Sequence, residues 1–255
     1  MGLSLSFDVS HAGNVPRGEC LIMHRIFTLL LVCMVIPSSY AAGMVDDPML
    51  TMVKVDQLEI TDIGDDNDLA WDAQAWVGKD LNKLWFKTEG ERVDNYFEEV
   101  EVQLLYSRAI ASYWDAQIGW RHDIKPKPTR DWLAIGVQGL APYFFETDIA
   151  LFVGYAGNIG LRTKFEYEFM FTQKWILTPK FEANLFSKKD KHVETGSGLS
   201  DVNLGLRLRY EIKREFAPYI GIEWDKRFGD TADFARDEGD DVSETRWVAG
   251  IRIWF

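Results

Sequence analysis

The chain has 255 residues, with 28 Lys and Arg against 40 Asp and Glu, so its formal net charge is −12. This acidic balance argues against nucleic acid as a partner and favours cations. Mean hydropathy is −0.17, and beyond the N-terminal region no run of 18 apolar residues occurs, so membrane-spanning helices are not expected. The alternating strands of a transmembrane β-barrel would escape such a hydropathy scan.

The N-terminal segment has the features of a secretory signal peptide. Residues 26–36 form a short apolar run that follows Arg25, and small residues lead up to Ala41. This arrangement predicts a signal peptide over 1–41, cleaved after Ala41, with Met23 as a candidate true start because the stretch before it is long for a signal. The protein is therefore expected to be exported.

Both cysteines, Cys20 and Cys33, lie before the predicted cut. The mature chain would then contain no disulfide and no thiolate metal site. The removed segment carries two basic and two acidic residues, so the mature charge is 26 minus 38, again −12.

The rest of the chain reads as alternating segments separated by turn-rich breaks, which indicates β-strands. Twelve strands are predicted, in chain order: 55–62, 69–78, 82–89, 95–107, 110–121, 130–140, 143–155, 159–171, 174–186, 199–213, 216–227 and 243–255. The breaks alternate between tight turns and longer polar loops, such as 228–242, a pattern typical of outer-membrane barrels. We expect residues 42–54 to be a short periplasmic tail and 55–255 a monomeric, all-β, up-and-down antiparallel barrel.

The two faces of each strand differ in chemistry. On 199–213 the predicted lipid-facing set is Val202, Leu204, Leu206, Leu208 and Tyr210, and the lumen-facing set is Asn203, Gly205, Arg207, Arg209 and Glu211. A soluble sandwich would give the same local pattern. The signal peptide, the aromatic residues at strand ends and the terminal Phe255 favour the barrel.

An outer-membrane barrel that ends on Phe255 places that residue at the periplasmic end, and an even strand count returns the N-terminus to the periplasm. Both charge signs line the predicted lumen. A narrow water-filled path and an interior closed by salt bridges both remain open.

Motifs of enzymes are scarce, and no catalytic chemistry is expected. The chain has no Gly-x-Ser-x-Gly elbow, no P-loop and no His-Glu-x-x-His. Ser197 lies in a predicted loop and offers only a weak case for a hydrolase. Asp65–Asp68 lacks the glycine and the closing glutamate of a calcium loop, so a solvated turn is preferred. His122 and His192 are expected in outer loops.

Several longer stretches carry a family resemblance. They are 71–85 (WDAQAWVGKDLNKLW), 101–110 (EVQLLYSRAI), 136–143 (GVQGLAPY), 205–212 (GLRLRYEI) and 214–221 (REFAPYIG). Across 55–255 the chain resembles the copper resistance protein B (CopB) family. The resemblance implies an outer-membrane location, binding of copper and a role in copper tolerance.

Candidate copper ligands follow from that resemblance. Relatives often carry a Met- and His-rich segment before the barrel, whereas this chain has only Met44, Met49 and Met52 there and no His. Three thioethers suit Cu(I), although a leader whose methionines do nothing is an equal reading. In the barrel, Met170 is expected to face the lumen near Glu166 and Glu168, as a copper contact or as a packing residue.

The working hypothesis is a copper-handling protein of the outer membrane, in contact with membrane lipid and copper ions. It would sequester copper, pass it across the membrane or dock a periplasmic copper carrier or oxidase. The alternative is a general small-solute pore unrelated to copper.

Overall fold

Strands make up most of the described chain. The computed structural model describes residues 47–61, 68–93 and 96–255; the predicted signal peptide, Met44 and most of Asp65–Asp68 lie outside these ranges. The strands are β1 (Leu50–Thr61), β2 (Asp68–Gly78), β3 (Asn82–Val93), β4 (Tyr96–Ala111), β5 (Trp114–Lys125), β6 (Arg130–Ala141), β7 (Phe145–Gly154), β8 (Ile159–Glu166), β9 (Phe169–Met170), β10 (Trp175–Phe186), β11 (Gly198–Tyr210), β12 (Phe216–Arg227) and β13 (Ser243–Trp254). Two short 3-10 turns, η1 (Pro142–Phe144) and η2 (Tyr155–Gly157), and one α-helix, α2 (Gly229–Glu238), complete the described elements.

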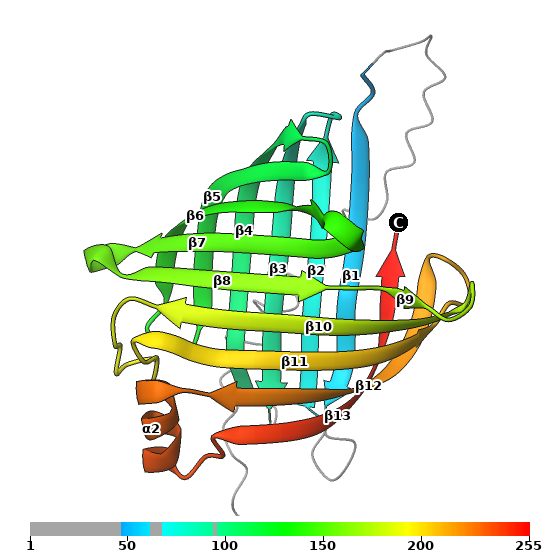
Figure 1. The fold of residues 1–255 in the computed structure, drawn as a ribbon. Helices are drawn as coiled ribbons and strands as arrows, with labels where there is room; N and C mark the ends of the chain where they lie inside the picture. The colour runs from blue at the N-terminus through cyan, green and yellow to red at the C-terminus, as the bar shows by residue number, and fades with distance from the viewer. Residues whose placement is uncertain (1–46, 62–67, 94–95) are drawn as a thin grey trace, which may run out of the picture. The chain divides into compact units, whose positions relative to one another are not determined.

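Residues 47–255 close into an antiparallel barrel (Figure 1). Each strand pairs with its neighbours in sequence, and the last strand pairs with the first, for example through Ile60 and Ala249. β8 and β9 both pair with β10, so they form one interrupted strand and the wall has twelve. The predicted twelve-stranded up-and-down barrel is confirmed.

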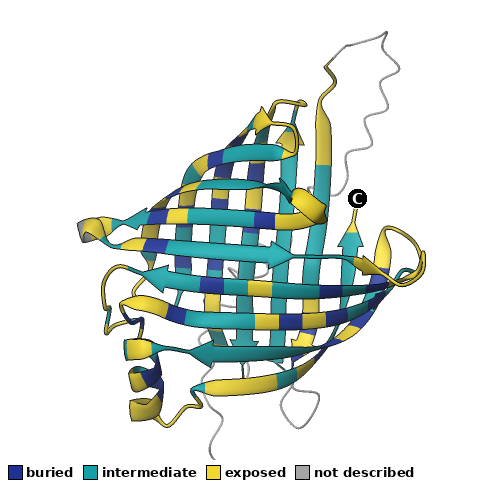
Figure 2. Cartoon of the chain, viewed as in Figure 1, coloured by how far each residue is buried: buried dark blue, intermediate teal, exposed yellow. Residues whose placement is uncertain are grey.

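Buried and exposed residues alternate along the strands (Figure 2), as expected for a membrane barrel with polar residues inside and apolar residues outside. On β4, the polar Glu101, Gln103 and Ser107 are buried, whereas Leu104 and Tyr106 are 46% and 45% exposed. A soluble sandwich would bury the apolar set instead. Charged side chains point inward and most exposed apolar side chains point outward, so the outer wall suits hydrocarbon. The lumen also contains a buried apolar cluster, made by Trp85, Leu105, Trp132, Ala134 and Phe152.

Several strand boundaries differ from the sequence prediction. β1 begins at Leu50, so residues 50–54 belong to the barrel wall and not to the predicted tail. The strand expected at 110–121 is β5, Trp114–Lys125, and the turn before it contains Tyr113 in the left-handed region, at φ 69°. β3 likewise continues to Val93 instead of ending at 89. Pro126 and Pro128 follow β5, and because proline lacks an N–H, the strand ends where they begin. The prediction that His122 lies in a loop was therefore wrong, since it is on β5.

The helix α2 was not predicted, because its region was expected to be a loop. It is ten residues long and buries only Ala232 and Ala235, so it has no wide apolar stripe in sequence. Gly239, at φ 91°, ends it in the left-handed conformation that favours glycine. Among the helices of the described residues, none has the length and apolar character needed to cross a membrane.

The interruption of the β8–β9 strand has a local cause. The Tyr167 N–H donates to the Pro179 carbonyl at 3.2 Å, but Pro179 has no N–H with which to return a ladder bond. A proline inside a paired strand removes one hydrogen bond. The β8–β10 seam therefore lacks one ladder hydrogen bond at this point.

Candidate functional site: the charged lumen and its mouth

The two ends of the barrel differ in their connections. At one end, the chain passes between strands by short turns, at 79–81, 112–113, 142–144, 171–174 and 211–215. At the other end are the longer connections 187–197 and 228–242, the second of which contains α2. In outer-membrane barrels short turns face the periplasm, so we name the short-turn end the periplasmic mouth.

Lys164 bridges opposite walls of the lumen. It donates a hydrogen bond to Glu89 of β3 and lies 3.8 Å from Asp72 of β2 and 3.6 Å from Glu182 of β10. β2 and β8 are six places apart around the twelve-stranded wall, which makes them diametrically opposite. The lumen is therefore crossed by ion pairs at this level. We name this group, Lys164 with Glu89, Asp72 and Glu182, the Lys164 bar.

A second chain of charges lies beside this bar. The Arg162 guanidinium forms two bonds of 3.0 Å to the Glu101 carboxylate, and the same carboxylate lies 2.7 Å from Arg121. Arg121 in turn donates to Asp123 at 2.7 Å, and Asp123 is 3.1 Å from Arg130. Planar guanidinium groups suit such paired contacts with carboxylates.

The β1–β11–β12 side of the lumen is held by a buried pair. Arg207 donates to both oxygens of Glu59, at 3.0 and 2.7 Å, and also to Glu223. The Tyr219 hydroxyl donates to Glu59 at 3.0 Å. The guanidinium lies close to Gly205, where an added Cβ would meet Arg207 Nη1, so a larger residue there would require the guanidinium to shift.

Nearer the periplasmic mouth, Glu168 joins two strands. It accepts hydrogen bonds of 2.8 Å from Arg209 and from Arg252. Arg252 also lies 3.4 Å from Asp56, which is 2.6 Å from Lys54. This mouth chain, Lys54–Asp56–Arg252–Glu168, runs from β1 to the segment between β8 and β9.

The structure places the predicted ligands around this mouth without gathering them into one site. Met52 lies two residues before Lys54 on β1 and, like Trp76, packs against the buried cluster that contains Trp85. Met170 lies two residues beyond Glu168 on β9 and is 69% exposed. β1 and β9 are five places apart around the wall.

The remaining predicted ligands differ in their surroundings. Met49 is 68% exposed just before β1. Glu166 sits opposite Lys180 across the β8–β10 pair, and Glu168 is already shared by two guanidinium groups. Met44 lies outside the described residues.

Within the described ranges, no group of three or more His, Cys, Asp or Glu is arranged to hold a metal ion. His122 is bonded to Asp131 at 2.8 Å and stacks on Trp120, with ring centroids 5.4 Å apart. Thioethers are the soft donors among the predicted ligands, and Met49 and Met170 are the ones whose side chains are exposed.

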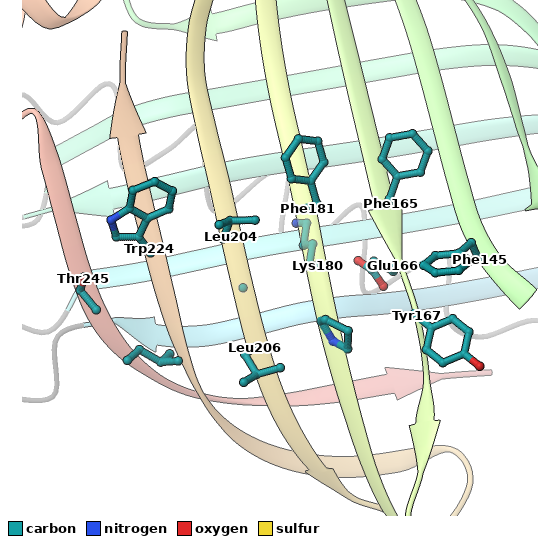
Figure 3. Close-up of a pocket in the computed structure, with 13 residues that line it drawn as sticks. Phe145, Phe165, Glu166, Tyr167, Lys180, Phe181, Leu204, Leu206, Trp224 and Thr245 are labelled. Carbon is teal, nitrogen blue, oxygen red and sulfur yellow. The ribbon is translucent and has the colours of Figure 1, made fainter.

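Two hollows flank the wall near the β8–β10 seam. The larger, about 320 Å³, lies on the outer face between outward side chains that include Phe165, Phe181 and Leu204 (Figure 3). It is apolar and faces lipid, so it is not a site for ions. The smaller, about 30 Å³, lies inside the lumen near the mouth chain. Lys180 and Glu166 contribute to both.

Sequence reasoning predicted the inward faces of β8, β10 and β11 but missed their partners. It singled out neither the bar through Lys164 nor the Arg207–Glu59 pair. One signal for these partners was available in the sequence: charged residues on the inward-facing positions of other strands, such as Asp72 on β2, Glu89 on β3 and Glu101 on β4. Pairing across a lumen depends on strand stagger, which period-two patterns do not carry.

Comparisons with known proteins agree with this architecture. The family model described as copper resistance protein B precursor (CopB) matches residues 49–255. Copper resistance protein B of Escherichia coli is 43% identical over 210 residues, which cover 82% of this chain and 71% of that protein. The copper resistance protein B homolog of Pseudomonas syringae pv. tomato is 41% identical over 219 residues, covering 86% and 74%.

Among solved structures, the NanC porin is similar in fold, with a TM-score of 0.53 at 12% identity, covering 80% of this chain and 99% of that one. An apolar outer wall around a polar lumen, in a porin-like fold, is the architecture of an outer-membrane protein. The family model spans the whole described barrel, and two relatives exceed 40% identity. The chain therefore belongs to the copper resistance protein B family.

Proposed function

We propose that the protein contributes to copper resistance by holding copper ions at the periplasmic mouth of a closed barrel. The observation that carries this proposal is the Lys164 bar, since ion pairs between opposite walls oppose a permanently open path. Copper enters the argument through the family. The proposal assigns no catalytic step, and a single barrel is sufficient for it.

Exposed thioethers would make the first contacts with copper. Met49 and Met170 are both more than two-thirds exposed, and sulfur ligands favour Cu(I) over harder cations. Met44 extends the set along the segment before the barrel, and Met52 follows on β1. Glu166 and Glu168 would act as secondary oxygen ligands, with Glu168 exchanging an arginine for the metal.

From the mouth, bound copper has three fates. It is sequestered there, handed to a docked periplasmic carrier or oxidase, or passed through the lumen after the ion pairs rearrange. Passage requires Lys164 to leave Glu89, whereas the other two fates leave the bar intact. This difference separates transport from sequestration experimentally.

Metal content tests the thioether contacts. The variant Met44→Leu/Met49→Leu/Met52→Leu/Met170→Leu should bind less Cu(I) than the parent when the purified protein is titrated against a competing chelator. Phe171→Leu is the matched control, since Phe171 adjoins Met170 and is 67% exposed. Unchanged Cu(I) affinity in the methionine variant would remove this site.

Copper tolerance tests the function itself. A strain lacking the protein should lose tolerance, regain it with the parent chain and regain less with the methionine variant. A steady, ohmic conductance in planar bilayers that does not respond to copper would instead favour a general small-solute pore.

A further inference from the structure

The small lumen cavity near the mouth chain is lined mainly by charged side chains. Four cationic side chains line it: Lys180, Arg207, Arg209 and Arg252. Two carboxylates, Asp56 and Glu166, also line it. Carboxylates outside the lining already pair with these cations: Glu59 and Glu223 with Arg207, Glu168 with Arg209 and Arg252, and Glu182 with Lys180. Its volume of about 30 Å³ matches one water molecule or one small ion.

Several donors at this cavity have no acceptor. Arg207 Nη1, Arg209 Nε and Thr178 Oγ1 are buried and lack a hydrogen-bond partner. Both arginine side chains are 7% exposed, and Thr178 is 8% exposed. Buried donors without acceptors are costly, so native structures rarely leave them unmatched.

These donors share one face of the wall. Thr178 and Arg207 are directly opposite in the β10–β11 pair. Arg209 lies two residues further along β11, so its side chain points the same way. One acceptor inside the cavity can therefore serve donors from both strands.

The chemistry selects the class of ligand. A guanidinium group has no lone pair to offer a metal cation. Asp56 is already engaged, by Lys54 at 2.6 Å and Gln74 at 2.6 Å. Glu166 is the register partner of Lys180 in the β8–β10 pair. We propose that this cavity binds one small inorganic anion of halide size, which accepts hydrogen bonds from Thr178, Arg207 and Arg209.

Bromide identifies such a site directly, because it replaces chloride and scatters anomalously. The full-length protein would be crystallised with sodium bromide as the only halide. A single anomalous peak in the cavity between β10 and β11 is the expected result. An ordered water without anomalous signal, or an empty cavity, would overturn the proposal.

A variant series tests the same site in solution. Thr178→Val removes one donor with little change of shape, and Thr61→Val is the control because Thr61 Oγ1 is also buried and unpartnered but does not line the cavity. At equal ionic strength, the Tm of the parent and of Thr61→Val should be higher in bromide than in gluconate, because a ligand that binds the folded state stabilises it. Thr178→Val should lose at least half of that difference. Equal Tm of the parent in the two salts would contradict the proposal.

Discussion

Lys164 of β8 and Glu89 of β3 form a hydrogen-bonded ion pair across the lumen, with side chains 16% and 23% exposed. Their strands come from opposite sides of the barrel, so this one contact ties the two walls together. A barrel of this strand number could enclose water, and this pair is one of the contacts that cross its lumen.

Removing the ammonium should open and weaken the barrel. In Lys164→Gln, Glu89 and Asp72 lose their shared cation, and breaking a buried pair typically costs about 3–5 kcal/mol. We expect lower unfolding stability in urea and a new conductance in planar bilayers. The control is Lys226→Gln, whose ammonium lies 5.3 Å from the Phe228 ring and takes no part in the bar. If Lys164→Gln shows no conductance in planar bilayers, the remaining ion pairs suffice to close the lumen.

Tyr219 should stabilise the fold through Glu59. Tyr219→Phe removes a 3.0 Å hydrogen bond to a buried carboxylate, and hydrogen bonds to charged groups are worth about 1.5–3 kcal/mol. In a Glu59→Leu background the same change should cost much less, because the acceptor is gone. Urea unfolding in lipid vesicles, followed by tryptophan fluorescence, measures both differences. If Tyr219→Phe lowers the free energy of unfolding equally in the two backgrounds, Tyr219 does not stabilise the fold through Glu59.

Pro179→Ala should strengthen the β8–β10 seam. The substitution supplies an N–H facing the Tyr167 carbonyl, and one added ladder bond is worth about 0.5–1.5 kcal/mol. Amide exchange at Phe169 and Met170 should slow, because the interrupted strand gains continuity. Pro218→Ala on β12 is a control at a strand without such a break. Unchanged exchange would mean that the interruption has another cause.

The contact between α2 and the 187–197 loop should respond to pH. Partial desolvation, followed by a hydrogen bond to Glu238, raises the pKa of Glu194 above its ordinary range. A carboxyl whose folded pKa is raised binds its proton more tightly in the folded state, so stability of this contact increases as pH falls through that pKa. Protection of α2 amides, corrected for intrinsic exchange, should be greater at pH 5 than at pH 7. Glu194→Gln should abolish the difference, and Glu244→Gln should not.

The fold was largely predictable because each strand carries its own evidence. Side chains of 199–213 alternate between Leu204 or Leu206 and Arg207 or Arg209, and this period of two determines both strand and face. The boundary of β5 was not predictable in the same way. Its turn depends on Tyr113 adopting a left-handed conformation, which no local preference of tyrosine indicates. The short helix α2 was missed because it lies in a polar segment.

The candidate functional site was also predictable only in part. The sequence by itself determined which residues of β8, β10 and β11 face the lumen, and that both charge signs do so. It placed Met44, Met49 and Met52 in a tail before the barrel, whereas the structure has Met52 on β1. Only the tertiary structure decided that Lys164 meets Glu89, that Arg207 meets Glu59 and that Thr178 shares a cavity with two arginines. The physical reason is that facing depends on the period of a single strand, whereas partners across a lumen depend on barrel closure and stagger, which all twelve strands set together.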